Sequence, residues 1–320
     1  MNGQISINDF DFQLICEYFA SVDRQGPGTD AATRKALELT EGLPPHPDIC
    51  DIGCGTGSSA LLLARETQGR VTAVDLFPRF IRQVESQAAR YGLSERLKGC
   101  VADMAGLPFS DASFDLLWAE GSIYNVGFGR GLRLWHRLLR PGGCIAVSEA
   151  TWFLPEPPQD VLDFWNDAYP EIDTMPRKLQ LLEQAGYEPL AAFRLPKEAW
   201  TEAFYRPQAT AQEKFLKAHP DSATARSLVD NQRREAQLYE KYHDYYGYAF
   251  LHRPQAPVGR RMEACLPRPF RRKDAQKIPG RTGRGFSMPT GHAMSYMNNV
   301  SEAQRRFFTT LPFCMTKSNS

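Results

Sequence analysis

Short apolar runs alternate with longer amphipathic segments between about residues 45 and 150 of the chain. The apolar runs have the length of buried strands, and the segments between them repeat apolar residues at helical spacing. Strands are expected at 47–52, 71–74, 97–101, 114–119 and 144–147, and helices at 58–66, 78–91 and 131–139. This alternation predicts an α/β fold with a parallel sheet covered on both faces. Right-handed crossovers would place a ligand crevice at the carboxyl ends of the first strands.

The pattern changes after residue 150. Residues 151–176 are rich in proline and aromatic residues and are expected to form an irregular cap over the crevice. The remaining elements predicted are a helix at 179–185, a strand at 189–195, a largely helical stretch at 208–241 and a last aromatic strand at 245–251.

A glycine-rich turn, Asp51-Ile52-Gly53-Cys54-Gly55-Thr56-Gly57, directly follows the first predicted strand and opens the first helix. Glycines here let the backbone turn tightly and approach a ligand closely. Acidic residues follow the next two strands: Asp75, and Asp103 with Met104 beside it. Carboxylates at successive strand ends suit an adenosine, with the ribose hydroxyls at Asp75, the adenine amino group near Asp103 and Met104 against the ring.

The glycines alone do not decide the cofactor, because nicotinamide dehydrogenases place a G-x-G-x-x-G turn at the same point. The third glycine of that pattern would fall on Ser58, whereas this chain has Gly57. An acidic residue just before the turn, Asp51, would repel a pyrophosphate but suits a ligand with an ammonium or sulfonium group. Both features favour a methyl donor over a nicotinamide.

The ordered motifs resemble those of class I S-adenosylmethionine-dependent methyltransferases, in particular the group similar to the ubiquinone/menaquinone-biosynthesis methyltransferases. Further segments resemble an uncharacterised bacterial branch of that family, and the resemblance covers about residues 7–253. The core motifs are 51–57, 75, 102–104, 107–117 and 138–143, and the branch-specific segments are 119–125, 148–153 and 163–171.

The resemblance implies a Rossmann-like, doubly wound sheet of seven strands, whose antiparallel last strand, 245–251, lies beside 189–195. It implies S-adenosyl-L-methionine as the cofactor, with Gly53, Gly55 and Gly57 along its methionine and ribose portions. Glu120 would lie at the methyl-transfer end of the crevice. The full set of expected cofactor-binding residues is Asp51, Gly53, Cys54, Gly55, Gly57, Asp75, Leu76, Asp103, Met104 and Glu120.

In the resembling family the N-terminal segment closes over the donor. The turn at 26–30 is therefore a candidate donor contact, and a plain capped turn is the alternative. Thr29 or Asp30 is expected to cap the helix that follows, because a side-chain oxygen there can accept a free backbone N–H.

Catalysis of methyl transfer needs few chemical groups. It is a single in-line displacement, so alignment and exclusion of water can supply most of the acceleration, and a base is needed only where the acceptor loses a proton. Glu120 and Glu149 both end core strands on the ligand side and are candidates for that base. The alternatives are that Glu120 only binds the donor's ammonium group and that Glu149 only fixes the cap. Tyr124 and Tyr169 are candidates to orient the acceptor. The alternative is that both side chains only pack within the cap.

Composition narrows the class of protein. The chain has 320 residues and no run of 18 apolar residues, which argues against a transmembrane helix. Its first residues lack the basic and apolar regions of a secretory signal. The cysteines are seven and scattered, with neither a Cys-x-x-Cys nor a Cys/His cluster. They predict no disulfide framework and no metal site, and favour reduced thiols in the cytoplasm.

A small organic molecule is the favoured methyl acceptor, because Trp152, Phe153, Trp165 and Tyr169 would give the cap an aromatic lining. Two other functions stay open: an RNA or other nucleic-acid methyltransferase, and a non-catalytic S-adenosylmethionine-binding module. Methylation of base amino groups typically uses an Asn/Asp-Pro-Pro-aromatic tetrad after the fourth strand, and the sequence there is Ala119-Glu120-Gly121-Ser122.

The formal charge of +1 conceals an uneven distribution. Residues 253–320 contain 13 Lys and Arg but three acidic residues, so the rest of the chain is acidic, which suits a cationic donor better than a polyanionic substrate. Little hydrophobic periodicity predicts disorder for this basic tail. The predicted domains are an N-terminal helical segment at 1–44, a methyltransferase domain at 45–252 with insertions at 151–176 and 208–241, and the tail at 253–320.

Overall fold

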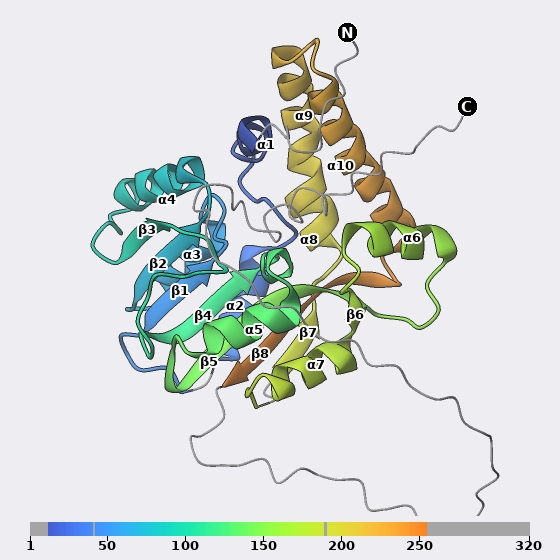
Figure 1. The fold of residues 1–320 in the computed structure, drawn as a ribbon. Helices are drawn as coiled ribbons and strands as arrows, with labels where there is room; N and C mark the ends of the chain where they lie inside the picture. The colour runs from blue at the N-terminus through green and yellow to red at the C-terminus, as the bar shows by residue number, and fades with distance from the viewer. Residues whose placement is uncertain (1–11, 41, 189–190, 255–320) are drawn as a thin grey trace, which may run out of the picture.

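The centre of the molecule is a mixed β-sheet with strand order β3-β2-β1-β4-β5-β8-β7, and a short strand, β6, pairs with β5 (Figure 1). This computed structural model describes residues 12–40, 42–188 and 191–254. Strands β1 to β5 run parallel, whereas β8 is antiparallel to both β5 and β7. The strands are β1 (Asp48–Ile52), β2 (Arg70–Asp75), β3 (Leu97–Val101), β4 (Phe114–Glu120), β5 (Leu139–Trp152), β6 (Asp173–Thr174), β7 (Ala191–Arg194) and β8 (Tyr246–Pro254).

Helices cover both faces of the sheet and extend beyond the carboxyl ends of its parallel strands (Figure 1). The α-helices are α1 (Phe12–Phe19), α2 (Asp30–Glu38), α3 (Ser58–Glu66), α4 (Pro78–Arg90), α5 (Phe128–His136), α6 (Gln159–Ala168), α7 (Met175–Gln184), α8 (Glu198–Trp200), α9 (Arg206–Ala218) and α10 (Ala223–Tyr242). A 3₁₀ turn, η1 (Ile123–Asn125), follows β4, and a π-helical turn, η2 (Thr201–Tyr205), joins α8 to α9.

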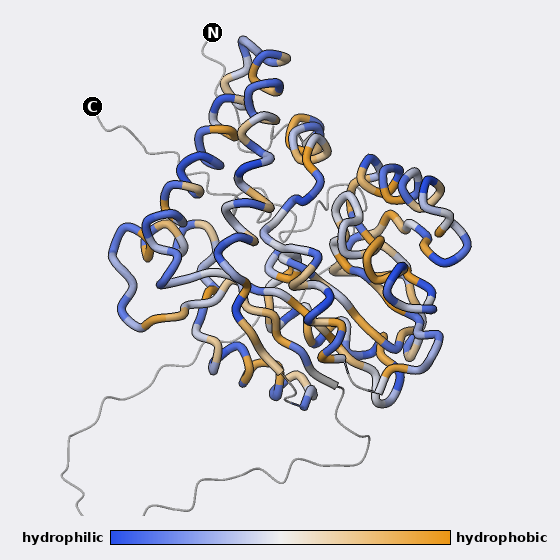
Figure 2. Tube along the Cα trace, turned by 180° about the vertical axis from the view of Figure 1, so that it is seen from behind, coloured by the Kyte–Doolittle hydropathy of each residue, from blue (hydrophilic) through white to orange (hydrophobic). Residues whose placement is uncertain are grey.

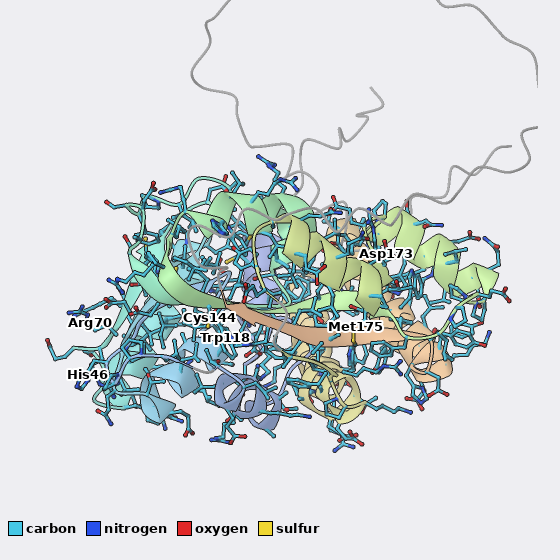
Figure 3. All side chains as sticks on the ribbon, turned by 90° about the horizontal axis from the view of Figure 1, so that it is seen from below. His46, Arg70, Trp118, Cys144, Asp173 and Met175 are labelled. Carbon is cyan, nitrogen blue, oxygen red and sulfur yellow. The ribbon has the colours of Figure 1, made fainter. Side chains whose placement is uncertain are left out.

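Successive strand residues point to opposite faces of the sheet, so the central strands supply two hydrophobic cores. On one face, Leu116 and Trp118 of β4 pack with apolar residues of α2, α3 and α4. On the other, Leu117 and Ala119 pack with residues of α5 and α7. Figure 3 shows the sheet edge-on between its two helical layers, with Trp118 and Cys144 beside it, and Figure 2 shows that the strands are mostly apolar. Apolar runs covered on both faces therefore produce the layered fold.

A third cluster joins the N-terminal helix to the long helices that precede β8. Leu14, Tyr18 and Phe19 of α1 pack with Phe215 of α9 and with apolar residues of α10. The Tyr18 hydroxyl donates a 2.6 Å hydrogen bond to Gln208 Oε1 on α9, so a buried polar pair is satisfied inside this cluster. The cluster holds α1 beside the helical extension above the sheet (Figure 1).

The expected doubly wound α/β fold is confirmed, including the antiparallel last strand, β8, between β5 and β7. The structure adds the short parallel pairing of β6 with the end of β5, which makes eight strands among the described residues. The helical insertion predicted at 208–241 corresponds to α9 and α10, separated by a break at 219–222. Thr29 caps α2, as predicted, by accepting the Ala32 N–H at 3.0 Å.

Several predicted elements have different bounds in the structure, and α7 (Met175–Gln184) begins four residues before the helix expected at 179–185. The helix expected at 131–139 is α5, which begins at Phe128 and ends at His136. A Cβ at Gly131 would lie 2.8 Å from Ile123, so the glycine allows α5 to pack closely on the preceding turn. The strand expected at 144–147 is much longer, because β5 pairs with β4 on one side and with nine residues of β8 on the other.

The cap, which we expect to be helical and aromatic, has more regular structure than an irregular segment. Residues 151–176 contain α6 at their centre, and α7 begins at Met175. Two of their prolines stand at helix starts: Pro158 precedes α6, and Pro176 is in the first turn of α7, where a missing N–H costs little. Strand β8 also continues to Pro254, past the predicted domain end at 252, and the rest of the predicted tail lies outside the described residues.

Within the described ranges, no helix is long and apolar enough to cross a membrane. The same residues contain no group of His, Cys, Asp or Glu side chains arranged to hold a metal ion.

Candidate functional site

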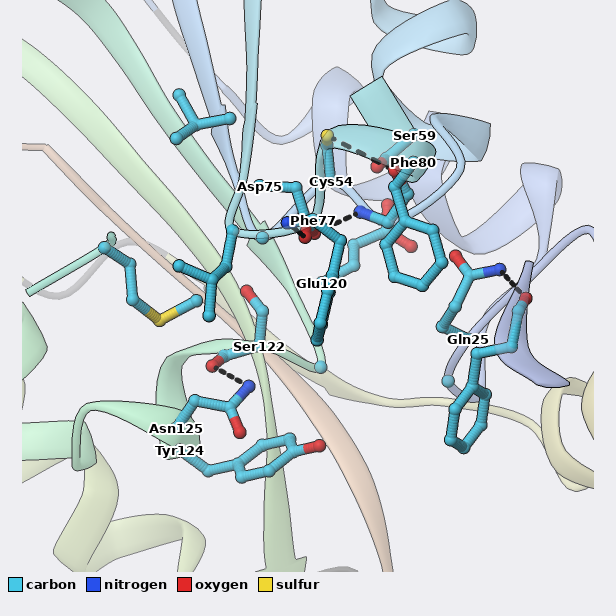
Figure 4. A pocket seen from close by; sticks show the side chains of 18 of the residues that line it. Gln25, Cys54, Ser59, Asp75, Phe77, Phe80, Glu120, Ser122, Tyr124 and Asn125 are labelled. Carbon is cyan, nitrogen blue, oxygen red and sulfur yellow. Dashed lines mark hydrogen bonds between the residues drawn. The ribbon is translucent and has the colours of Figure 1, made fainter. Parts of the chain in front are cut away.

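A cavity opens where β1, β2 and β4 end, at the edge of the sheet that the crossover rule predicts (Figure 4). The glycine-rich turn, the ends of β2 and β4 and the segment before α2 all contribute to its walls. The lining residues are Ile15, Phe19, Arg24, Gln25, Gly26, Pro27, Gly53, Cys54, Gly55, Ser58, Ser59, Val74, Asp75, Leu76, Phe77, Phe80, Ala102, Asp103, Met104, Ala105, Glu120, Gly121, Ser122, Tyr124, Asn125 and Val126.

Two glycines of the turn line the cavity in backbone conformations that disfavour a side chain. Gly53 has φ of +75°, and a Cβ there would lie 2.5 Å from the Cβ of Ser122. Gly55 has φ of +55°, and a Cβ there would lie 2.1 Å from Gln25 Oε1. Both positions therefore require glycine, and both let the backbone form the cavity wall.

Gly57 serves packing between two helices. It has φ of +96°, and a Cβ there would lie 2.8 Å from Cγ2 of Val84 on α4. Gly57 precedes α3 and is not among the residues that line the cavity. Its place is therefore behind the wall, where it allows α3 and α4 to approach each other. Cys54 does line the cavity, and burial raises the pKa of its thiol.

Asp75 ends β2 with its carboxylate fixed inside the cavity. Its Oδ2 accepts the Gly55 N–H at 3.0 Å, and its Oδ1 accepts the Phe77 N–H at 3.0 Å. Burial raises the pKa of Asp75 to about 6, against the lowering effect of these backbone hydrogen bonds. The two bonds tie the carboxylate to the glycine-rich turn, and Leu76 lines the cavity beside it.

Asp103 and Met104 line the cavity wall after β3, as predicted. Asp103 Oδ1 accepts the Ala105 N–H at 2.9 Å, which fixes the carboxylate at the strand end. The Met104 carbonyl accepts a 2.8 Å hydrogen bond from Trp135 Nε1, which anchors this loop to α5. Together with Phe77, Met104 gives this end of the cavity apolar surface.

Glu120 ends β4 and links three separate parts of the chain. Its Oε1 accepts hydrogen bonds from Thr33 Oγ1 at 2.6 Å and from Trp118 Nε1 at 2.9 Å. Its Oε2 lies 3.3 Å from Nη1 of Arg24, and the Glu120 side chain is 8% exposed. This carboxylate is therefore paired with Arg24, which also lies 2.9 Å from Asp30 Oδ1, and it holds the segment before α2 over the cavity.

Asp51 lies directly beneath the glycine-rich turn and does not line the cavity. Its Oδ2 accepts a 2.6 Å hydrogen bond from Ser59 Oγ, and its Oδ1 is buried without a hydrogen-bond partner among the described residues. Burial raises the pKa of Asp51 to about 7, and the nearby carboxylates of Glu120 and Asp75 act in the same direction. Asp51 is thus a buried acid behind the cavity wall.

A second cavity adjoins the first beneath α6 and α10. The two share Phe19, Gln25, Gly26, Pro27 and Tyr124, so Tyr124 stands at their boundary. The other lining residues of the second cavity are Ala150, Phe164, Trp165, Ala168, Tyr169, Phe204, Gln232, Glu235 and Tyr248. Of the aromatic residues predicted to line the cap, Trp165 and Tyr169 line this cavity, whereas Trp152 and Phe153 line neither cavity. The Tyr169 ring centroid is 5.7 Å from that of Tyr124.

Glu149 lies in a buried ion pair and lines neither cavity. Its Oε1 is 2.6 Å from Nζ of Lys178 on α7 and accepts a hydrogen bond from the Tyr169 hydroxyl. Both charged side chains are fully buried, and burial raises the pKa of Glu149. These contacts connect β5 to the cap and to α7. They agree with the alternative that Glu149 fixes the cap and is not a base.

The polar cavity residues that were not among the candidates from the sequence include Arg24, Gln25, Gln232 and Glu235. Arg24 and Gln25 directly precede the Gly26-Pro27-Gly28 turn, and that turn was the available signal for them. Gln232 and Glu235 are three residues apart on α10 and line the second cavity. The i, i+3 spacing was visible in the sequence, but a polar pair on a helix ordinarily faces solvent.

Comparison with known proteins identifies the domain that surrounds the first cavity. Residues 49–143 match the family model described as a methyltransferase domain. The 27-O-demethylrifamycin SV methyltransferase of Amycolatopsis mediterranei is 28% identical over 195 residues, which cover 55% of this chain and 69% of that protein. Demethylmenaquinone methyltransferase of Chlorobaculum tepidum is 33% identical over 119 residues, which cover 37% of this chain and 46% of that protein.

The aligned part of the chain spans about half the length of most curated relatives that it matches. Among solved structures, a SAM-dependent methyltransferase from Geobacter sulfurreducens in complex with S-adenosyl-L-homocysteine superposes with a TM-score of 0.67. It is 20% identical, over 76% of this chain and 98% of that one, so the shared property is the fold.

Proposed function

We propose that this chain, which carries a class I methyltransferase domain, transfers a methyl group from S-adenosyl-L-methionine to a small organic molecule. The observation that supports this most directly is the pair of adjoining cavities. One is walled by the glycine-rich turn and the carboxylates of Asp75, Asp103 and Glu120, and the other is mostly aromatic. A transferase needs two such sites in contact, one for the donor and one for the acceptor.

The residues of the first cavity fit S-adenosylmethionine. The Asp75 carboxylate is fixed where a strand-end acid accepts ribose hydroxyls, and Gly53 and Gly55 leave the backbone open to the ligand. Asp103 would accept the adenine amino group while Met104 covers the ring. Arg24 and Glu120 offer opposite charges, which suits the carboxylate and the ammonium group of the donor's methionine portion.

The donor supplies an activated methyl group, and the chain's own residues align and shield it. The segment at 24–27 covers the cavity, because Arg24 and Thr33 both bind Glu120 at the end of β4. Tyr124, at the boundary of the two cavities, is placed to orient an acceptor, and burial raises the pKa of its hydroxyl, which keeps it neutral. This arrangement supports catalysis by alignment and exclusion of water.

The candidate bases differ in what their contacts support. Glu120 lines the first cavity and contacts Arg24 and Thr33, so we assign it to donor binding and closure of the cavity. Glu149 is paired with Lys178 and lines neither cavity, so we assign it to fixing the cap. Asp51 and Gly57 are assigned to the support of the glycine-rich turn from behind.

A small-molecule acceptor is favoured over a nucleic acid because the second cavity is bounded by Phe164, Trp165 and Tyr169 beneath a helix. The relatives named above act on a rifamycin and on demethylmenaquinone, by their names. We also propose that the protein functions in the cytoplasm, in keeping with five free cysteines in the described part of the chain.

The test is a calorimetric titration with S-adenosyl-L-homocysteine. The wild-type protein is expected to bind, Asp75→Ala to lose binding, and Asp221→Ala, a change at an exposed acid, to bind normally. Absence of binding to the wild type, or unchanged binding to Asp75→Ala, contradicts the proposal. Labelled S-adenosylmethionine supplied with a metabolite extract and with RNA then distinguishes the acceptor classes. Label in RNA alone would favour a nucleic-acid substrate. Donor binding without any methyl transfer would favour a non-catalytic module.

A further inference from the structure

The second cavity contains two polar side chains that no assigned role uses. Its walls are largely apolar, formed by Ala150, Phe164, Trp165 and other aromatic side chains. Glu235 and Gln232, three residues apart on α10, project from the same helix face into this surface. A carboxylate and an amide in an apolar chamber are unfavourable unless a partner satisfies them.

Among the described residues, Glu235 accepts one hydrogen bond, from the Tyr205 hydroxyl at 3.1 Å. No ion pair to Glu235 forms within residues 12–40, 42–188 and 191–254, and burial raises the pKa of this carboxyl to about 7. The hydroxyls that interact with it are neutral, because burial raises the pKa of each of these tyrosines: Tyr18, Tyr124, Tyr205, Tyr246 and Tyr248. The carboxylate therefore retains capacity to accept another hydrogen bond.

Gln232 is the second, independent observation. Its side chain is 1% exposed, and both Nε2 and Oε1 are buried without a hydrogen-bond partner among the described residues. Leaving such a group unsatisfied costs about 1–3 kcal/mol, so native structures rarely do so without a reason. An oxygen atom of a ligand in the chamber would give Nε2 an acceptor.

The backbone opposite this pair is also unusual. Residues Thr201–Tyr205 form a π-helical turn, a conformation that is frequent at functional sites. The turn places Phe204 in the chamber wall and directs the Tyr205 hydroxyl to Glu235. A second helical segment therefore holds the Glu235 carboxylate in place at the chamber.

On the basis of the proposed function, we propose that Gln232 and Glu235 form the polar subsite for the methyl acceptor, and that the acceptor is an uncharged, largely apolar molecule with a hydroxyl group next to a second oxygen. The hydroxyl donates to Glu235, and the neighbouring oxygen accepts from Gln232 Nε2. A cationic amine would satisfy Glu235 but would leave the Gln232 N–H donors without an acceptor. The aromatic walls bind the rest of the molecule.

The experiment measures binding of three probes of similar size to the full chain saturated with S-adenosyl-L-homocysteine. Catechol has adjacent hydroxyls, toluene has none, and benzylamine is a cation at neutral pH. Calorimetry or ligand-observed NMR at pH 8 is expected to show at least about tenfold tighter binding of catechol than of toluene, the effect of hydrogen bonds to an ionised group. Equal binding of catechol and toluene, or tighter binding of benzylamine, overturns the inference.

Variants assign the effect to the subsite. Glu235→Gln and Gln232→Leu are each expected to weaken catechol binding about tenfold and to leave toluene binding within about twofold. Glu213→Gln and Gln237→Leu, changes at exposed positions of α9 and α10, are the matched controls and should bind catechol as the wild type does. Catechol binding that is unchanged in both subsite variants contradicts the proposal.

A pH series provides the readout that a purely structural role would not change. Catechol affinity of the wild type should rise as the pH increases from 6 through about 7 to 8, because an ionised Glu235 accepts better, and should stay constant in Glu235→Gln. Donor binding is followed in every sample. Intact S-adenosyl-L-homocysteine binding with no catechol preference overturns the subsite alone, whereas loss of donor binding in the wild type overturns the proposed function.

Discussion

The guanidinium group of Arg24 lies 3.3 Å from the carboxylate of Glu120, across 96 residues of sequence. Arg24 belongs to the segment that precedes α2, and Glu120 is the last residue of β4. A second bond from the same region, Thr33 Oγ1 to Glu120 at 2.6 Å, makes the connection double. The end of β4 therefore determines where the N-terminal segment crosses the donor cavity.

Replacing Arg24 with alanine is expected to weaken S-adenosyl-L-homocysteine binding about tenfold or more. The variant loses a charged contact for the donor's carboxylate and leaves the Glu120 carboxylate, 8% exposed, without its cation. Calorimetric titration measures the effect. Arg34→Ala, which removes an exposed ion pair with Glu66, is the control and should bind as the wild type does. Equal affinities of Arg24→Ala and Arg34→Ala would show that Arg24 takes no part in donor binding.

The glycine-rich turn allows ligand binding and helix packing to be separated. Gly53→Ala is expected to abolish donor binding, because the new Cβ would lie 2.5 Å from Ser122 at a positive φ and the cavity wall would have to move. Gly57→Ala places its Cβ 2.8 Å from Val84 behind the wall and should mainly lower stability, by about 1–3 kcal/mol.

Thermal unfolding and calorimetric titration of the same samples test this difference. Gly106→Ala is the control, because a Cβ there meets no atom within 4 Å. A Gly57→Ala protein that folds stably yet fails to bind S-adenosyl-L-homocysteine would place Gly57 at the ligand instead of behind the wall.

The parts of the site that could be predicted from the sequence are those at the ends of strands. A buried apolar run specifies its own strand, and crossover geometry brings the ends of such strands together, so Gly53, Gly55, Asp75 and Asp103 could be assigned to one cavity from local patterns. Their convergence in the structure follows that logic. The resemblance assigned Gly57 to the ligand as well, whereas Gly57 lies behind the cavity wall, because spacing does not reveal which side of a turn a residue faces.

The parts that were not predictable depend on partners distant in sequence. Glu149 was recognised as a strand-end acid, but its pairing with Lys178 required knowing that α7 packs against β5. Glu235 could not be distinguished from the exposed acids of a long polar helix until η2 and the cap enclosed it. The prolines and aromatic residues of the cap indicated an irregular segment, whereas Pro158 precedes α6 and Pro176 lies in the first turn of α7.

The ion pair between Lys178 and Glu149 predicts a large effect from removing one partner. Lys178→Met should lower the free energy of unfolding by about 3–5 kcal/mol, because it leaves a fully buried carboxylate without its cation. The double variant Lys178→Met/Glu149→Leu should recover much of that loss, since both charges are gone. Urea unfolding provides the measurement.

Lys197→Met is the matched control, because Lys197 pairs with Glu240 at the surface and should contribute less than about 1 kcal/mol. If the double variant is as unstable as Lys178→Met, the loss of stability comes from the altered packing and not from the unpaired charge of Glu149.

Asp51 predicts a dependence of stability on pH. Its pKa is about 7 in the folded protein and 3.8 in an exposed carboxyl, because burial disfavours the ionised form. Between these values the folded chain retains a proton that the unfolded chain has released, so the folded state binds more protons. The stability that Asp51 contributes is therefore fully present below about pH 3.8 and is lost as the pH rises through about 7.

Asp51→Asn removes this dependence and keeps an oxygen that can accept the Ser59 hydroxyl. The melting temperature of the variant minus that of the wild type should increase by at least about 3 °C between pH 5 and pH 8, measured without donor. Asp221→Asn, at an exposed position, should show a difference that stays constant with pH. A difference that is flat or decreases for Asp51→Asn would mean that the folded protein holds Asp51 ionised across this range, with a positive partner for its second oxygen.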